Sequence, residues 1–333
     1  MHPDVLEDIM ARKSPAAAKA AREAKATEHV AYVADTYATM LEAGTADPAK
    51  YVTPWHAATA NGLPVNAATG NVYRGTNLLW LSLLGGGYWA TYRQWQGMGG
   101  QVRKGETGAT IWRPKHMVKK VDEDGAPLEK PRAFTIWSTA VVHHVSQQDG
   151  WTPPEAATRP ALSDDPCPAF DAWAANLPTS GVKLTHRDAA RAYYNPAADA
   201  ITLPPVEAFK SHQGYRSTLA HEAGHATGHA DRLNRDGITG RHPFGSPGYA
   251  LEELVAELTS ATMGLSLGFE TEIAPDHMHY LASWAKAIRE DPSALQTAMK
   301  QAAAASTYLL QYAPAAAAAT DADADADADA AAA

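Results

Sequence analysis

Apolar residues recur every three or four positions in two stretches of the C-terminal half of the chain. This spacing predicts two amphipathic helices, over Thr218–His229 and over Tyr249–Leu267. The apolar face of the first is formed by Leu219, Ala220, Ala223 and Ala226. That of the second is formed by Leu251, Leu254, Val255 and Leu258. Both helices are therefore expected to be buried along one side.

The N-terminal half has a different pattern. One amphipathic helix is predicted over Glu28–Glu42, and Gly44 and Pro48 end it. Beyond it, turn-forming residues break the chain into short pieces. Short helices are predicted over Asn77–Leu84 and Tyr92–Met98, and short strands over Ala109–Trp112 and Ala133–Val142. A further small sheet is expected in the C-terminal half, near Leu184 and over Tyr193–Leu203.

These patterns predict an α+β protein of two domains, a small α+β domain followed by a mainly helical one. Five prolines between Gln147 and Pro168 indicate a linker between them. The expected segments are a flexible N-terminus at 1–27, a first domain at 28–148, the linker at 149–168, a second domain at 169–313, and a disordered Asp-Ala tail at 314–333.

Composition narrows the class of protein. Hydrophobic residues make up 45% of the 333, which is typical of a globular chain. The single cysteine, Cys167, excludes a disulfide framework and a thiolate zinc cluster. The sequence has neither a signal-peptide core nor an 18-residue apolar run, so a cytoplasmic location away from membranes is expected.

Charge is distributed unevenly along the chain. Residues 50–120 hold nine basic residues and one acidic residue, Glu106, together with nine aromatic residues. Basic side chains bind phosphates, and exposed aromatic rings stack on unpaired bases. Most of these rings are expected in the core of the domain, with a few left as platforms. The N-terminal half is therefore predicted to bind single-stranded nucleic acid.

The first C-terminal helix carries His221-Glu222-Ala223-Gly224-His225, an HExxH motif. On a helix, His221 and His225 lie one turn apart on the same face and can bind one Zn²⁺ ion, or another divalent metal. Glu222 then lies beside the open position of the metal as a general base toward water. The motif predicts metal-assisted hydrolysis, most often of a peptide bond.

A catalytic zinc site needs a third protein ligand. Glu253 and Glu257 lie four residues apart on the second helix, so they share a face. We assign Glu253 as the ligand and Glu257 as the acceptor of a hydrogen bond from a ligating histidine. This pattern resembles that of the gluzincin metallopeptidases. An alternative follows from reading His221–Asp231 as HExxHxxGxxD, which resembles the metzincin pattern with Asp231 as ligand. Tyr249 is a candidate donor to a developing oxyanion, with ordinary packing as the alternative.

Several blocks of sequence occur in the order found in ArdC-type antirestriction proteins. In the N-terminal half they are Thr53-Pro54-Trp55, Gly62-Leu63-Pro64-Val65-Asn66, Tyr73-Arg74-Gly75-Thr76-Asn77 and Gly99-Gly100-Gln101-Val102-Arg103-Lys104-Gly105-Glu106. In the C-terminal half they include the HExxH helix, Arg232-Leu233-Asn234-Arg235 and Tyr249–Glu257. The chain resembles this family over about residues 28–312. It departs at Ala223-Gly224, where larger residues are usual, and at its Ala-rich and Asp-Ala termini.

The resemblance implies an N-terminal domain that binds single-stranded DNA and a C-terminal metallopeptidase-like domain, in a protein that protects mobile-element DNA from host restriction. Two alternatives stay open: a DNA-coating protein with a structural metal, and a DNA-dependent protease that acts on DNA-bound proteins. The residues expected to contact phosphates are Arg74, Arg93, Arg103, Lys104 and Arg113. Those expected to stack on bases are Trp55, Tyr73 and Trp95.

Overall fold

The computed structural model describes residues 15–46, 63–121, 127–154, 166–240, 242–243, 246–271 and 280–314. The fold is a mixed α+β fold, as predicted. The first described element is a long helix, α2 (Pro15–Ala46), which starts before the predicted Glu28. Its first turns are rich in alanine, the residue with the highest helix propensity, so helix extends through part of the segment expected to be flexible.

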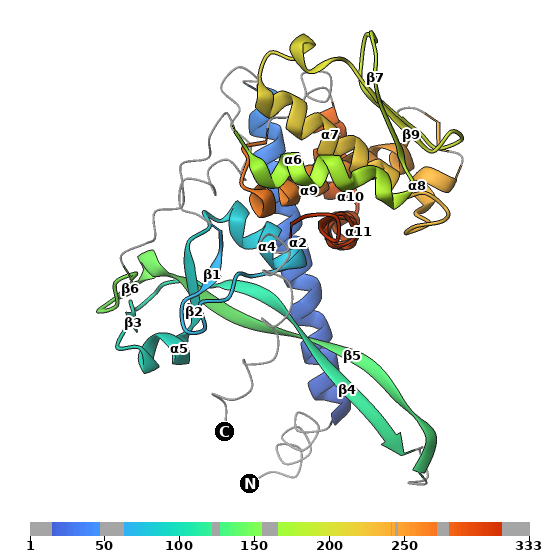
Figure 1. The fold of residues 1–333 in the computed structure, drawn as a ribbon. Coiled ribbons are helices and arrows are strands. Elements are labelled where there is room, and N and C mark those ends of the chain that lie inside the picture. Colours follow the sequence, from blue (N-terminus) through green and yellow to red (C-terminus); the bar gives the residue numbers. More distant parts are fainter. Residues whose placement is uncertain are drawn as a thin grey trace, which may run out of the picture.

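The N-terminal half is built on a four-stranded sheet in the order β1-β2-β5-β4. Its strands are β1 (Val65–Asn66), β2 (Tyr88–Thr91), β4 (Ala109–Val121) and β5 (Pro127–His144). Beyond β2, the strands β4 and β5 continue as a two-stranded antiparallel ribbon that extends away from the rest of the fold (Figure 1). Both strands are longer than predicted, because they pair with each other from Ala109↔Val142 to Val121↔Pro127.

Two short helices and a second small sheet complete this half. The helices, α4 (Gly75–Leu83) and α5 (Tyr92–Gly97), lie where they were predicted. The Thr91 side chain caps α5 by accepting a hydrogen bond from the Gln94 backbone, and the Gln94 side chain accepts one in return. Strands β3 (Gln101–Val102) and β6 (Gln148–Asp149) pair antiparallel, and the 3₁₀ turn η1 (Val145–Gln147) precedes β6.

The C-terminal half is mainly helical. Its helices are α6 (Pro168–Asn176), α7 (His212–Ala226), α8 (Asp236–Thr239), α9 (Pro247–Leu267), α10 (Leu281–Glu290) and α11 (Pro292–Leu310). A three-stranded sheet in the order β7-β9-β8 packs beside α7 (Figure 1). Its strands are β7 (Lys183–His186), β8 (Tyr193–Asn195) and β9 (Ala200–Leu203), and the 3₁₀ turns are η2 (Leu177–Ser180) and η3 (Val206–Ala208). Within the described residues, no helix is long and apolar enough to span a membrane.

One hydrophobic core joins the two halves. Helix α2 packs against α10 and α11, and α4 packs against α11 and α9. The same buried cluster contains Tyr37 and Leu41 from α2, Trp80 from α4, and Leu258 and Trp284 from α9 and α10. The two halves are therefore held together by buried apolar surface as well as by the chain. The predicted linker and tail lie partly outside the described residues, at 155–165 and 315–333.

His29 on α2 is buried in this core and gives stability a dependence on pH. Its ring lies 4.6 Å from the ring of Trp112 and 6.1 Å from that of Trp80. Burial lowers the pKa of His29 from 6.5 to about 4. Because the folded-state pKa lies below the unfolded value, protonation favours the unfolded chain. The full stability is present above pH 6.5 and falls as the pH drops toward 4.

We expect wild type to lose about 1–2 kcal/mol more stability than His29→Gln between pH 7 and pH 4, after allowance for partial screening by solvent. Urea unfolding of both proteins at the two pH values measures this difference. Losses of equal size would show that His29 does not carry the effect.

Candidate metal centre

Helix α7 carries the HExxH motif. The Ser211 side chain caps the helix by accepting a hydrogen bond from the Gly214 backbone at 2.9 Å. The helix begins six residues before the predicted Thr218 and ends at Ala226, so the motif lies in its last turns. His221 and Glu222 are buried, at 3% and 6% exposure. The motif is therefore on a buried face rather than on a solvated surface.

Helix α9 crosses α7 at close range and brings its acidic residues to the histidines. The approach is closest at Gly224, where a Cβ atom would lie 3.2 Å from both the Cα of Ala256 and the Cβ of Thr259. A side chain at 224 would push the helices apart. This accounts for a glycine within the motif, at one of the two positions where larger residues are usual in the resembling family.

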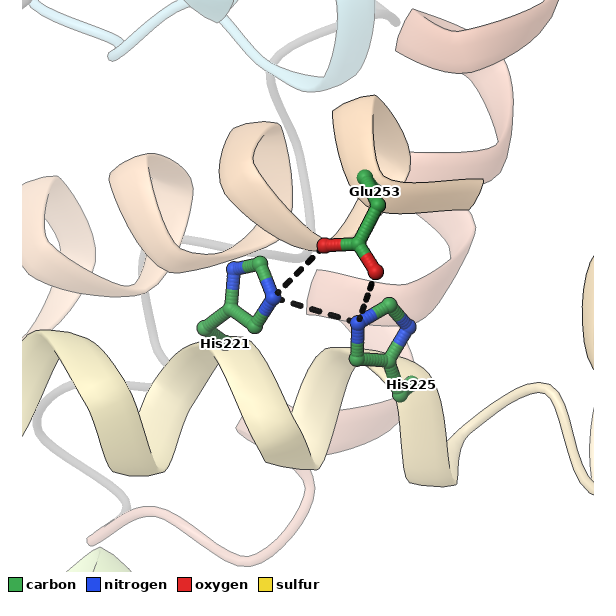
Figure 2. A group of neighbouring side chains, drawn as sticks. All are labelled: His221, His225 and Glu253. Carbon is green, nitrogen blue, oxygen red and sulfur yellow. Dashed lines mark hydrogen bonds and ion pairs between the residues drawn. The ribbon is translucent and has the colours of Figure 1, made fainter. Parts of the chain in front are cut away.

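Three side chains from the two helices converge on one point (Figure 2). The Nε2 atoms of His221 and His225 lie 3.1 Å apart. The carboxylate oxygens of Glu253 lie 3.4 Å from Nε2 of His221 and 3.7 Å from Nε2 of His225. Ligand atoms about 2.0–2.2 Å from a tetrahedral zinc are about 3.3–3.6 Å apart. The donor set thus has the chemistry and the spacing of a three-ligand metal site.

The competing ligand lies elsewhere. Helix α7 ends before Asp231, whose side chain is 90% exposed and approaches the Nδ1 of His229 at 3.6 Å. The backbone amide of Asp231 also donates to that nitrogen. In the described structure, Glu253 rather than Asp231 joins His221 and His225.

Each histidine has a carboxylate at its second ring nitrogen. Glu257 lies 3.6 Å from the Nδ1 of His221, which is beyond hydrogen-bond distance, so the predicted hydrogen bond stays a prediction. Glu252 lies 3.3 Å from the Nδ1 of His225. The sequence did not indicate Glu252, because with three glutamates in six residues the choice of partner depends on the exact crossing of the helices.

Carboxylates shift the pKa of His225 at the candidate metal centre. Burial alone would lower the pKa of His225, but the nearby charges of Glu253 and Glu252 outweigh it and raise the pKa. Burial opposes ionisation of Glu253, yet the two histidines hold the pKa of that carboxyl well below its usual range. Both shifts arise because a positive charge between these groups is strongly stabilised. The same field favours a cation.

Two further predicted residues are Glu222, which follows His221 in α7, and Tyr249, which lies one turn before Glu253 in α9. Glu222 is 6% exposed, and no hydrogen bond or ion pair within the described residues engages its carboxylate. A carboxylate in this position is open to a water molecule. Burial raises the pKa of Tyr249, and its hydroxyl group forms a hydrogen bond with Glu253. A role of Tyr249 toward an oxyanion stays a prediction.

The predicted DNA-contacting residues are distributed over the N-terminal half with different exposures. Arg93 and Lys104 are exposed, whereas Arg74, Arg113 and Tyr73 are half-buried. The guanidinium group of Arg103 pairs with Glu106 at 2.9 Å and with Asp149 at 3.1 Å, which reduces the charge that it offers to a phosphate. Trp55 lies outside the described residues.

The prediction that Trp95 stacks on a base is wrong. Trp95 has 0% exposure, and its ring nitrogen donates to the backbone oxygen of His143 at 3.0 Å, so neither ring face can meet a base. Among the described aromatic residues of 63–120, the exposed one is Tyr92, at 43%. Tyr92 lines an open pocket of about 550 Å³ together with Arg103 and Lys104. Its position in the first turn of α5 follows from the capping box at Thr91.

The site and fold define the class of the C-terminal half. Residues 171–301 match the family model of a zincin-like metallopeptidase. Residues 27–145 match the model of the N-terminal domain of the anti-restriction factor ArdC. The class of protein is therefore an ArdC N-terminal domain joined to a zincin-like domain.

Relatives and solved structures agree with this class. The crystal structure of the antirestriction protein ArdC from plasmid R388 is 32% identical, with a TM-score of 0.60, over 83% of this chain and 97% of that one. Its Mn(II)-bound form is 31% identical, with a TM-score of 0.59 over the same shares of the two chains. The uncharacterized protein y4eC of Sinorhizobium fredii is 37% identical over 79% of this chain and 85% of its own length.

A DNA primase TraC of Escherichia coli is 36% identical over 84% of this chain, but this match spans 20% of the primase. From the matches to both halves, the chain belongs to the ArdC family of antirestriction proteins.

Proposed function

We propose that this protein binds single-stranded DNA through its N-terminal half, carries a zinc-dependent peptidase-like site in its C-terminal half, and protects incoming mobile-element DNA from host restriction inside the cell. The observation that carries the proposal is the convergence of His221, His225 and Glu253, whose donor atoms all lie within 4.8 Å of one another. This convergence occurs in a chain whose two halves both match ArdC.

In this proposal His221, His225 and Glu253 hold the metal. Two imidazoles and one carboxylate suit Zn²⁺, and the Mn(II)-bound ArdC structure makes Mn²⁺ the alternative to test. A divalent cation at this place supplies Lewis acidity toward water and toward a substrate carbonyl. Glu222 accepts a proton from water and later returns it to the leaving amine. Glu257 and Glu252 orient the two histidines through their Nδ1 atoms.

For DNA, the proposal relies on the surface around α5 and β3. Tyr92 is exposed and Lys104 lines the same pocket, where Arg103 is paired with Glu106 and Asp149. Arg93 lies beside Tyr92 and is exposed. A ring that can stack on a base, with basic groups close to it for the phosphates, is the combination used by proteins that bind single strands without sequence preference.

Binding of the full chain to labelled single-stranded and duplex DNA tests this half of the proposal. The full chain is needed because the core that supports α2 and α4 includes residues of α9 and α10. We expect tighter binding to single strands. The slope of log K against log salt should be about −2 to −3.5, as for three to five phosphate contacts.

Arg93→Ala combined with Lys104→Ala should make this slope shallower by about 1.4. The matched control is Lys183→Ala combined with Lys286→Ala, which removes two exposed cations from the C-terminal half and should leave the slope unchanged. Equal affinity for duplex and single strands, or equal effects of the two double variants, would contradict the proposal.

One further function has support from a specific observation. The core shared by α2, α4, α9 and α10 gives DNA on the N-terminal half a mechanical connection to the helix that carries Glu253. A protease activated by DNA would use this connection. The coating function with a structural metal is less well supported, because a structural site has no need of Glu222, whose carboxylate lacks a partner among the described residues.

A further inference from the structure

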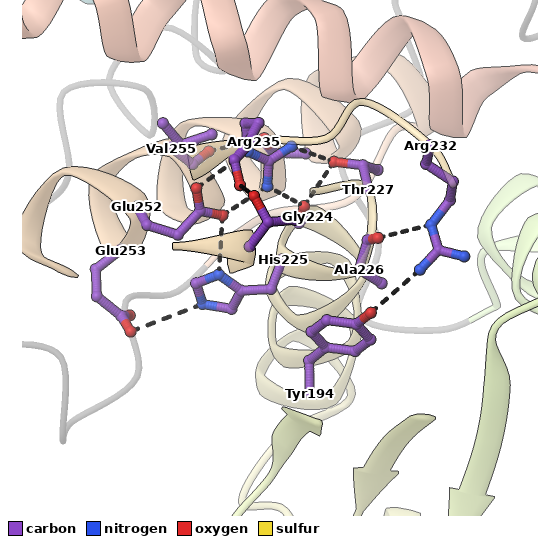
Figure 3. Close-up of polar contacts among 12 residues, drawn as sticks. Tyr194, Gly224, His225, Ala226, Thr227, Arg232, Arg235, Glu252, Glu253 and Val255 are labelled. Atoms are coloured by element: carbon purple, nitrogen blue, oxygen red, sulfur yellow. Dashed lines mark hydrogen bonds and ion pairs between the residues drawn. The ribbon is translucent and has the colours of Figure 1, made fainter. Parts of the chain in front are cut away.

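A buried ion pair lies behind the candidate metal centre, on the side of His225 (Figure 3). Arg235 and Glu252 have side chains that are each 4% exposed. Nε of Arg235 donates to one carboxylate oxygen of Glu252 at 3.0 Å, and Nη2 donates to the other at 2.6 Å. This two-point contact fixes both the charge and the orientation of the carboxylate. The same carboxylate then faces the Nδ1 of His225 at 3.3 Å.

Arg235 also binds the end of the helix that carries the motif. Its Nη2 donates to the backbone oxygen of Gly224 at 2.7 Å, and its Nη1 donates to the hydroxyl group of Thr227. Gly224 lies directly before His225, and a cation at a helix C-terminus is favourable. Arg235 therefore connects the backbone beside His225 to the carboxylate that faces the ring of His225.

Gly237 and Gly228 lie against the Arg235–Glu252 ion pair, and a side chain at either position would overlap with it. A Cβ atom at Gly237 would lie 2.6 Å from a carboxylate oxygen of Glu252, and one at Gly228 would lie 3.0 Å from Nη2 of Arg235. The chain around the ion pair is thus fitted closely to it. A second pair, Arg232 with Asp199, has a similar bidentate geometry, with side chains that are 5% and 26% exposed. Within the described residues, this pair forms no hydrogen bond or ion pair with either histidine of the motif. It serves as the internal reference for a purely structural pair.

We propose that Arg235 and Glu252 are positioning residues that hold the proton of His225 on Nδ1 and so present the lone pair of Nε2 to the metal. The inference rests on the proposed metal centre. A carboxylate that is kept ionised by Arg235 accepts a hydrogen bond only from a protonated nitrogen. When the metal displaces the proton from Nε2, the proton that remains on Nδ1 is held by Glu252, and Nε2 is the nitrogen that coordinates.

The test compares Glu252→Gln with Asp199→Asn in the full chain. Each variant neutralises one carboxylate that forms a two-point contact with an arginine. Affinities for Zn²⁺ and Mn²⁺ are measured by competition with a chelator, and folding is checked by circular dichroism and thermal melting. Glu252→Gln should bind metal 10–100-fold more weakly than wild type. Asp199→Asn should bind within threefold of wild type, whatever its loss of stability.

Nitrogen-15 spectra of the histidine rings give a readout that stability does not change. The spectra are recorded above the raised pKa of His225, where the metal-free ring is neutral. Under these conditions the wild-type ring should be a single tautomer with its proton on Nδ1, and in Glu252→Gln both tautomers should be populated. The resonance is assigned by its absence in His225→Asn. Arg235→Lys, which keeps the charge but loses the two-point contact, should lie between wild type and Glu252→Gln.

The outcomes separate the two proposals. Unchanged affinity and an unchanged tautomer in a folded Glu252→Gln protein would overturn the positioning role. If wild type binds neither metal, the proposed metal centre fails, while the spectra still decide whether Glu252 sets the tautomer. If Glu252→Gln does not fold, the double variant Arg235→Met, Glu252→Gln removes both buried charges. It should show the same weakening and the same mixture of tautomers.

Discussion

Replacing Glu222 with glutamine is expected to lower the rate of peptide-bond cleavage by the metal-loaded protein by about 10²–10⁴-fold, the usual contribution of a positioned general base. Glutamine has nearly the shape of glutamate but cannot accept the proton of water. Because Glu222 is absent from the converging donor set, metal affinity should stay within a few-fold of wild type. Cleavage of a fluorescently labelled unfolded protein, measured with and without single-stranded DNA, provides the rate.

The same experiment distinguishes the three functional hypotheses. Cleavage that requires DNA would favour the DNA-dependent protease. Absence of cleavage by wild type, together with full protection of DNA by Glu222→Gln in cells, would favour the coating protein. Equal rates for wild type and Glu222→Gln would exclude Glu222 as the base. Metal affinity, measured on the same samples, shows whether any loss of rate comes from loss of the metal.

Removal of the third ligand should have the largest effect on metal binding. Glu253→Ala is expected to weaken Zn²⁺ binding by about 100-fold or more, since four-ligand zinc sites bind with about 10–16 kcal/mol, or roughly 3 kcal/mol for each ligand. Asp231→Ala is the matched control, because Asp231 is the ligand in the alternative reading of the motif and its side chain is 90% exposed. It should leave the affinity unchanged. Competition with a chelator measures both.

The reverse result would be a loss of metal affinity in Asp231→Ala and none in Glu253→Ala. It would show that Asp231 is the third ligand, as in the metzincin pattern. Circular dichroism of each variant is needed alongside, because Glu253 is buried and in contact with both histidines. A folded Glu253→Ala protein with wild-type affinity would remove Glu253 from the site.

The helices of the candidate metal centre could be predicted from the sequence, because each is indicated by residues close together in the chain. Apolar spacing placed the helices that contain His221 and Glu253 to within a few residues. The separation of four residues put His221 above His225 and Glu253 above Glu257. This spacing places the residues on one helix face whatever the surrounding packing, because it depends only on helix geometry. The crossing of two such helices then brought the predicted ligands together.

The role of Glu252, the burial of Trp95 and the packing of α2 depend on contacts between elements distant in the chain, so they could not be predicted from the sequence. The role of Glu252 follows from the position of Arg235 in the loop after α7, which no periodicity encodes. Trp95 was misjudged because aromatic residues in a basic segment look alike whether they fill a core or face solvent. The packing of α2 on α10 and α11 joins segments more than 200 residues apart in the chain.

The core shared by the two halves also bears on whether either half could exist as a separate module. A module that can be exchanged alone must cover its own apolar faces, and here the faces of α2 and α4 are covered by α9, α10 and α11. The match with the DNA primase TraC, which spans 84% of this chain within 20% of the primase, contains both halves in one block. Recombination that separated them would expose a core on each side. The two halves therefore form a single structural unit.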